Sequence, residues 1–166
     1  MPRFSTFERS VLLPATVPEV YSFHEDPRNI TKISPPLLRV GRVECSLPVR
    51  AGEEFFLEMS LLGISMEWAG VWEIAEPGTR VGDTAARLVD CARKSPFLYW
   101  RHQHLFQPRG SETVMTDRLE YALLGGIPGR LLDATVMRVF FEIMFRARQR
   151  ATQNYFSSRL ASRASG

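Results

Sequence analysis

Hydrophobic and polar residues alternate through most of the chain between Leu38 and Tyr121, which is the pattern of strands with one buried face. Turn-forming residues interrupt this alternation about every ten residues, as at Ala51-Gly52 and Glu76-Pro77-Gly78. Short strands at this spacing usually pair with their neighbours in the chain, so the pattern predicts an antiparallel meander. Six strands are expected, at residues 38–47, 53–62, 64–75, 84–91, 100–106 and 113–121.

Shorter elements precede this region. Residues Phe4 to Leu13 alternate like a further strand, which Pro14 ends. Pro18 stands where the first turn of a helix tolerates proline, and Asp26-Pro27 repeats that arrangement with Asp26 as the N-cap. Two short helices are therefore expected after the first strand, the second of them ending at Pro35-Pro36.

A long helix is expected at the C-terminal end. Gly125 to Gly129 form a cluster of helix-breaking residues, which we interpret as a hinge. From Arg130 to about Ser158 nothing interrupts a helix, whose length is then about 40 Å. This segment is apolar on nearly all sides as far as Phe145, so it needs cover on more than one side.

Composition fits one globular domain that spans residues 1–166, with its core at about residues 4–158. Of the 166 residues, 45% are hydrophobic, and 11 Phe, 4 Tyr and 3 Trp leave room for an apolar cavity beside the core. No apolar run reaches the roughly 18 residues of a membrane-spanning helix. The N-terminus lacks the apolar segment of a secretory signal, and Cys45 and Cys91 lack metal-type spacing. A cytoplasmic protein is expected.

Positive charge gathers near the C-terminus. No acidic residue follows Glu142, whereas five arginines do: Arg146, Arg148, Arg150, Arg159 and Arg163. Cations of this kind interact favourably with the C-terminal end of a helix. The alternative is a weak contact with an anionic membrane surface. A net charge of +3 is too small to indicate a nucleic-acid partner.

Three ionisable residues are expected to lie on the inner face of the sheet. Successive strand side chains point to opposite faces, which places His102 and His104 inward with Trp100, and Asp117 inward on the next strand. Asp90 is also placed to reach this face. Because burial of such groups without a partner is costly, they either satisfy one another or serve a ligand.

Four interpretations of this group are open. The favoured one is a satisfied polar cluster in which the Asp117 carboxylate fixes an imidazole. The others are the polar anchor of a ligand, acid–base catalysis with Asp117 orienting a histidine, and a metal site of two histidines and one carboxylate. The sequence calls for neither a metal nor a cofactor.

Several motifs, in this order and spacing, resemble the START/polyketide cyclase–dehydrase/lipid-transport superfamily (SRPBCC), in its cyclase/dehydrase-like ligand-binding branch. They are Phe7-Glu8-Arg9-Ser10, residues 18–23, residues 26–30, Ser34-Pro35-Pro36, residues 95–106 and residues 113–121. One departure is Ser95, where that branch often has glycine. The resemblance implies an α+β helix-grip fold, in which a curved antiparallel sheet of about seven strands surrounds the long C-terminal helix.

The resemblance also implies a deep, largely apolar cavity between sheet and helix. The expected ligand-binding residues share the inner face of the sheet or the helix surface opposite it. They are Met59, Met66, Trp68, Trp72, Leu88, Trp100, His102, His104, Met115, Asp117, Tyr121, Val136 and Phe140. Gly70, between two inward tryptophans, is expected where the sheet bends or a ligand approaches.

The superfamily contains carriers as well as enzymes, so the resemblance implies a cavity without a particular reaction. We expect a carrier or sensor of a small hydrophobic or amphipathic ligand, such as a lipid, an isoprenoid quinone or a polyketide-like ring compound. The alternative is a cyclase, aromatase or dehydratase that uses His102, His104 and Asp117 for acid–base chemistry. A further alternative is a docking module, in which the apolar faces of the long helix form a homodimer.

Overall fold

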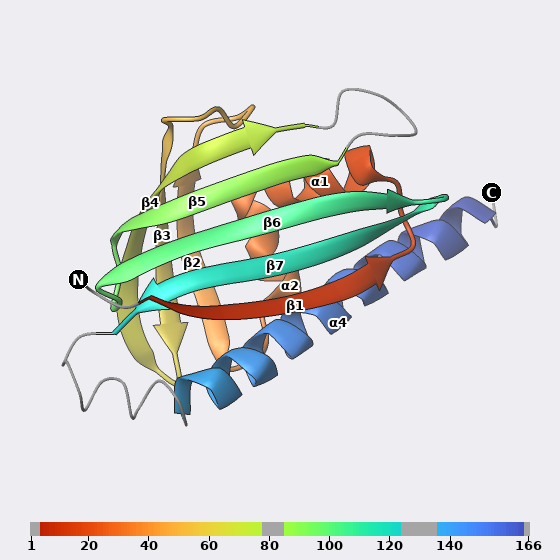
Figure 1. Cartoon of the computed structure of the whole chain (residues 1–166). Helices are drawn as coiled ribbons and strands as arrows, with labels where there is room; N and C mark the ends of the chain where they lie inside the picture. Colours follow the sequence, from red (N-terminus) through yellow and green to blue (C-terminus); the bar gives the residue numbers. More distant parts are fainter. Residues whose placement is uncertain (1–3, 78–84, 124–135, 165–166) are drawn as a thin grey trace.

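The computed structural model describes residues 4–77, 85–123 and 136–164 of the chain (Figure 1). In chain order the elements are β1 (Ser5–Leu13), α1 (Val17–Glu25), η1 (Pro27–Asn29), α2 (Ile30–Ile33), β2 (Leu38–Cys45), β3 (Glu54–Leu61), β4 (Ile64–Glu76), β5 (Ala86–Lys94), β6 (Tyr99–Arg109), β7 (Glu112–Ala122) and α4 (Arg138–Ala164). Every predicted strand is present, with ends that differ from the prediction by a few residues.

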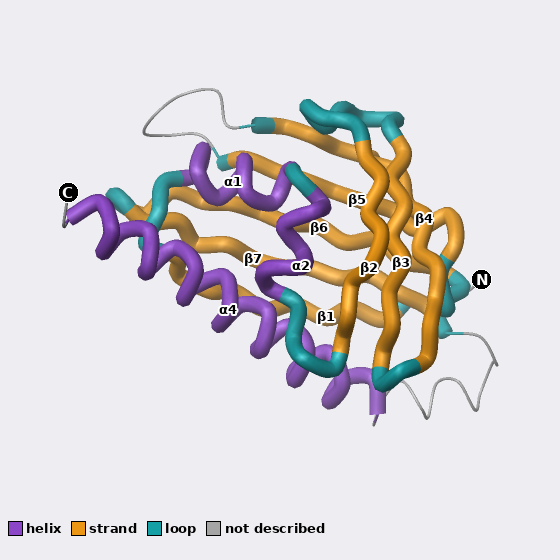
Figure 2. Tube along the Cα trace, turned by 180° about the vertical axis from the view of Figure 1, so that it is seen from behind, coloured by secondary structure: helices purple, strands orange, loops and turns teal. Residues whose placement is uncertain are grey.

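The strands form one antiparallel sheet in the order β1-β7-β6-β5-β4-β3-β2. Strands β2 to β7 follow one another as a meander, and β1 pairs with β7 at the far edge. The described helices all lie on one side of the sheet, and β2 and β3 run steeply across the direction of β6 and β7 (Figure 2). The predicted α+β helix-grip fold is confirmed.

The sheet bends where the pairing of neighbouring strands shifts register. Between β4 and β5 the register shifts at Ala69/Gly70 and again at Trp72/Ile74. Such a shift arises where one strand has an extra residue, a β-bulge, which bends the strand and increases its twist. Gly70 also lies directly against the ring of Phe55, since a Cβ built on Gly70 would be 2.4 Å from Phe55 Cζ. The prediction that Gly70 marks a bend is confirmed, although the group that approaches it is an aromatic side chain.

The two short helical segments begin as predicted. The Glu19 carboxylate accepts hydrogen bonds from the backbone N–H of Thr16, at 3.0 Å, and from its hydroxyl, at 2.9 Å. These bonds and Pro18 fix the first turn of α1. Asp26 caps η1 by accepting a hydrogen bond from the backbone N–H of Arg28, at 3.0 Å, and Pro27 is the first residue of that turn.

The long helix α4 has 27 residues and ends at Ala164, beyond the predicted end. Residues 124–135, which include the predicted hinge and the predicted helix start at Arg130, lie outside the described residues. Helix α4 packs along β1 and α2. Val139 is 58% and Ile143 56% exposed in the single chain, so cover of this part of the helix by a second copy of the chain stays a prediction. No helix in the described part of the chain is both long and apolar enough to cross a membrane.

Candidate ligand-binding cavity

A cavity of about 480 Å³ lies between the inner face of the sheet and α4, and α1 and α2 contribute to its wall. Its wall is mostly apolar, with residues such as Leu57, Trp68 and Trp72 from the sheet and Phe141 and Met144 from α4. Pockets for small organic ligands usually measure roughly 300–1,000 Å³ and have this mixture of apolar wall and few polar groups. The size and chemistry of the cavity therefore suit such a ligand.

Most of the residues predicted from the sequence line this cavity. They are Met59, Met66, Trp68, Trp72, Trp100, His102, His104, Met115, Asp117, Val136 and Phe140. Leu88 and Tyr121 do not line it. Leu88 is fully buried in the core cluster that α1 completes with Val20 and Tyr21. The Tyr121 ring packs against Phe141 of α4, with ring centroids 4.8 Å apart.

Six polar side chains gather in one part of the wall, and we call them the polar cluster. They are His24 from α1, Asp90 from β5, His102 and His104 from β6, Asp117 from β7 and Arg148 from α4. Strand register brings four of them together, because Asp90 is paired with His102 and His104 with Asp117. The predicted inward orientation of His102, His104 and Asp117 is therefore present in the structure.

Asp117 is the best satisfied member of the polar cluster. Its Oδ1 accepts from His102 Nε2 at 3.3 Å, and its Oδ2 accepts from Gln149 Nε2 at 2.8 Å. His104 Nδ1 lies 2.9 Å from Asp117 Oδ1, but poor alignment leaves this nitrogen without a formed hydrogen bond. Burial opposes the charge of Asp117, yet the contacts with His102 and His104 outweigh it and hold the pKa of Asp117 well below its usual value.

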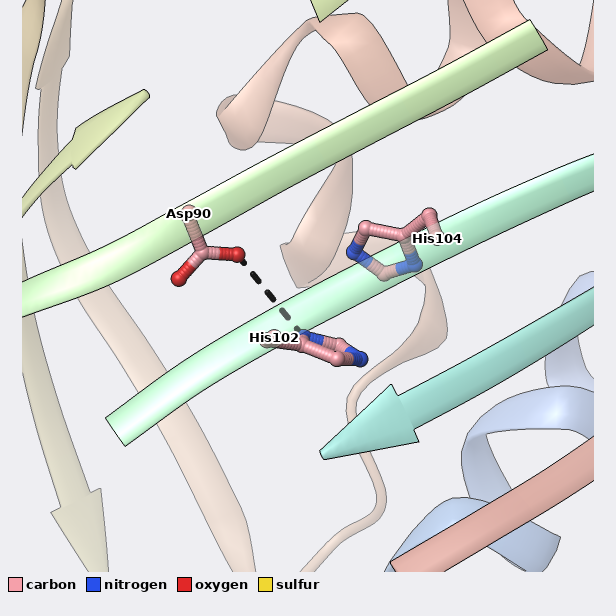
Figure 3. Close-up of side chains that lie close together, drawn as sticks. All are labelled: Asp90, His102 and His104. Carbon is pink, nitrogen blue, oxygen red and sulfur yellow. Dashed lines mark ion pairs between the residues drawn. The ribbon is translucent and has the colours of Figure 1, made fainter. Parts of the chain in front are cut away.

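Asp90 has a different environment. Its side chain is buried, and its Oδ2 lies 3.8 Å from His102 Nδ1, too far for a hydrogen bond (Figure 3). Among the described residues Asp90 makes no side-chain hydrogen bond. Burial raises the pKa of Asp90 to about 6, although the nearby His104 and Arg148 act in the opposite direction. One potential ligand atom from each of Asp90, His102 and His104 lies within 4.8 Å of the others.

Two members of the polar cluster were not predicted from the sequence. His24 Nδ1 contacts the Val20 carbonyl oxygen at 2.8 Å, and burial, followed by the nearby His104, lowers the pKa of His24 to about 3. The imidazole is therefore neutral, with Nδ1 as the donor. His24 follows the buried Val20 by four residues, so both lie on the same face of α1. This helical spacing is the signal in the sequence that places the His24 side chain inward.

Arg148 is the second residue that the sequence did not indicate, because it stands in a run of similar arginines. It lines the cavity from α4, and burial lowers the pKa of its guanidinium although Asp117 and Asp90 oppose this effect. Within the described ranges its side chain has no hydrogen bond or ion pair, and the guanidinium lies 5.6 Å from the Phe145 ring centroid. A half-buried cation without an anion in contact faces the cavity.

Solved structures resemble this chain in fold. The Zhui aromatase/cyclase from a Streptomyces species has a TM-score of 0.69 at 14% identity, over 95% of this chain and 96% of that chain. A START superfamily protein from Mycobacterium smegmatis has a TM-score of 0.68 at 11% identity, over 92% of this chain and 97% of that chain. The di-domain ARO/CYC protein BexL has a TM-score of 0.68 at 20% identity, over 90% of this chain and 45% of that chain.

Sequence comparison adds no closer relative, since no protein-family model and no curated protein matches the chain. Identities of this size show a shared fold and leave the activity open. The strand order, the single layer of helices and these likenesses agree with one another. The chain therefore has the helix-grip fold that these START and aromatase/cyclase structures share.

Proposed function

We propose that the protein binds a small amphipathic ligand in the cavity, as a carrier or sensor. The observation that carries this proposal is the cavity, which has a volume of about 480 Å³ and a largely apolar wall that contains the polar cluster. A lipid, an isoprenoid quinone or a polyketide-like ring compound has this distribution of apolar body and polar group. The likeness to START and aromatase/cyclase structures supports the proposal.

Arg148 supports an oxygen-bearing polar group on the ligand. A guanidinium that leaves water needs acceptors, since burial of an unpaired charge is costly. The described residues supply none within hydrogen-bonding distance of Arg148. A carboxylate, phenolate or quinone oxygen would supply one, while the apolar body of the ligand packs against side chains such as Trp68 and Trp100, whose rings are 4.9 Å apart.

The test is native mass spectrometry of protein purified gently from its own host, combined with a cavity-filling variant. The wild type is expected to carry one small apolar molecule. Met59→Trp fills the cavity and is expected to abolish that peak. The matched control is Glu58→Trp, which adds the same side chain on the opposite, exposed face of β3. A wild type that carries nothing apolar, and gains no thermal stability from a panel of lipids, quinones and ring compounds, contradicts the proposal.

A second candidate function is acid–base catalysis of ring closure or dehydration on such a ligand. The observation in its favour is the pair of Asp117 and His102, because the carboxylate accepts from Nε2 and leaves Nδ1, which lies 3.8 Å from Asp90 Oδ2, without a hydrogen bond to any described residue. His102→Ala is then expected to keep the fold and the ligand affinity while turnover of a linear polyketone substrate stops. A large loss of stability instead would assign His102 to structure alone.

Contacts outside the cavity stay predictions. The structure does not test a homodimer through the exposed apolar residues of α4, or a weak membrane contact of its arginine-rich end. It does not test the expected cytoplasmic location either. Sedimentation at low protein concentration addresses the first, since a monomer argues against a docking role for Val139 and Ile143. Vesicle flotation with anionic lipid addresses the second.

A further inference from the structure

We infer that Asp90, His102 and His104 together bind one divalent first-row metal cation, for which Zn²⁺ is the probe. These three side chains are buried, come from two paired strands, and offer ligand atoms within 4.8 Å of one another. Two imidazoles and one carboxylate are a common ligand set for such cations in proteins. The site adds a cation to the cavity and does not depend on which apolar ligand is bound.

The separation of Asp90 from His102 fits a shared cation. The two nearest atoms, Asp90 Oδ2 and His102 Nδ1, are 3.8 Å apart, which is too long for a direct hydrogen bond. Two ligands that bind one Zn²⁺ at about 2.1 Å with tetrahedral geometry lie roughly 3.4 Å apart. A cation between them therefore needs a closing movement of only a few tenths of an ångström. It would also give the buried Asp90 carboxylate a cation in direct contact, closer than the 3.8 Å approach of His102 Nδ1.

Asp117 contacts both histidines from the side away from the proposed cation and forms a hydrogen bond with His102. Its Oδ1 accepts from His102 Nε2 at 3.3 Å and lies 2.9 Å from His104 Nδ1. Each imidazole thus has one nitrogen directed at Asp117 and the other available as a ligand, and the second ring nitrogen of His104 lies on the side of Asp90 (Figure 3). Histidines that bind metals usually donate their other N–H to a carboxylate, as His102 does here. Gln149 donates to Oδ2 and holds the Asp117 carboxylate in place.

The charges around the site allow a divalent cation and favour an anionic fourth ligand. Asp90 and Asp117 supply two negative charges when ionised, and Arg148 on α4 supplies one positive charge that acts on both. His24, the remaining ionisable neighbour, faces His104 from α1 as a neutral ring 5.4 Å away. A divalent cation would leave an excess of about one positive charge. A hydroxide or a ligand oxygen in the cavity would balance it, and three protein ligands leave a position open for that oxygen.

The test is a Zn²⁺ titration of full-length protein after treatment with EDTA, by calorimetry, in a background in which Cys45 and Cys91 are replaced by serine. One equivalent of Zn²⁺ is expected to bind. Asp90→Asn is expected to weaken binding by more than the roughly 10–100-fold that loss of an outer-shell partner costs. Because Asp90 makes no hydrogen bond among the described residues, this variant is expected to fold. The matched control is Glu58→Gln, which neutralises a carboxylate on the exposed face of β3 and should leave the Zn²⁺ affinity unchanged.

Cobalt provides an independent readout. Co²⁺ in place of Zn²⁺ is expected to give visible absorption typical of tetrahedral nitrogen and oxygen coordination, and the absorption should be lost in Asp90→Asn. Absence of stoichiometric Zn²⁺ binding to the wild type, or equal affinity in Asp90→Asn, overturns the inference. Ligand binding to the EDTA-treated protein tests the cavity separately. If Zn²⁺ does not bind but the metal-free protein still binds an apolar ligand, the metal site is refuted and the proposed cavity function is not.

Discussion

Replacement of Asp90 by asparagine is expected to stabilise the metal-free protein at neutral pH. Asp90 is buried, and its pKa is raised from 3.8 to about 6, which means that the folded protein binds its proton more tightly than the unfolded chain does. The ionised carboxylate is less favourable in the folded protein than in the unfolded chain. The free energy of unfolding of the wild type therefore falls as the pH rises from about 4 to about 6. A difference of about two pKa units corresponds to about 3 kcal/mol. Asparagine has nearly the same shape and no charge to bury.

Urea unfolding in EDTA at pH 4 and pH 8 measures this effect. Asp90→Asn and the wild type are expected to have similar free energies of unfolding at pH 4, whereas at pH 8 the variant gains up to about 3 kcal/mol over the wild type. Asp26→Asn is a control of opposite sign, because a hydrogen bond from Arg28 lowers the pKa of Asp26 and its loss should destabilise at pH 8. If Asp90→Asn is less stable than the wild type at pH 8, the Asp90 carboxylate has a stabilising partner and the reasoning is refuted.

Two further substitutions test the cavity wall and the polar cluster. Gly70→Ala places a methyl group against the Phe55 ring, where the Cβ would lie 2.4 Å from Cζ. This substitution should lower the free energy of unfolding, measured by thermal unfolding, by about 1–3 kcal/mol and weaken ligand binding. Gly41→Ala is its control, since the nearest atom there is 3.6 Å away and little change is expected. Gln149→Leu leaves the buried Asp117 Oδ2 without its donor and should cost about 1–3 kcal/mol in urea unfolding. An unchanged stability would show that water or another donor replaces the amide.

The fold was largely predictable because its determinants are local. Alternation with period two identifies a half-buried strand without knowledge of its partner, and the turn residues between strands limit each one. Asp26 and Pro27 act within a single turn, so the second helical segment begins where the sequence indicated. The inward direction of His102 and Asp117 follows from the same alternation, once both are placed in strands.

The limits of the prediction arise where packing between distant elements decides. Leu88 and Tyr121 have the inward direction of cavity residues, but contact with the helices buries them in the core. The polar cluster depends on α4 and α1 for Arg148 and His24, and no local pattern shows that these helices meet β6. The exposure of Ile143 within the single chain could not be predicted for the same reason, because an apolar residue does not indicate by itself whether a neighbour covers it.

The central claim is that the cavity accommodates a small apolar ligand, and tryptophan fluorescence tests it most directly. The chain has three tryptophans, Trp68, Trp72 and Trp100, and all of them line the cavity. Titration of the protein with a hydroxylated tricyclic quinone is expected to change this fluorescence saturably, with one equivalent of ligand. A change that grows linearly without saturation, or that is the same for protein unfolded in urea, would contradict the account.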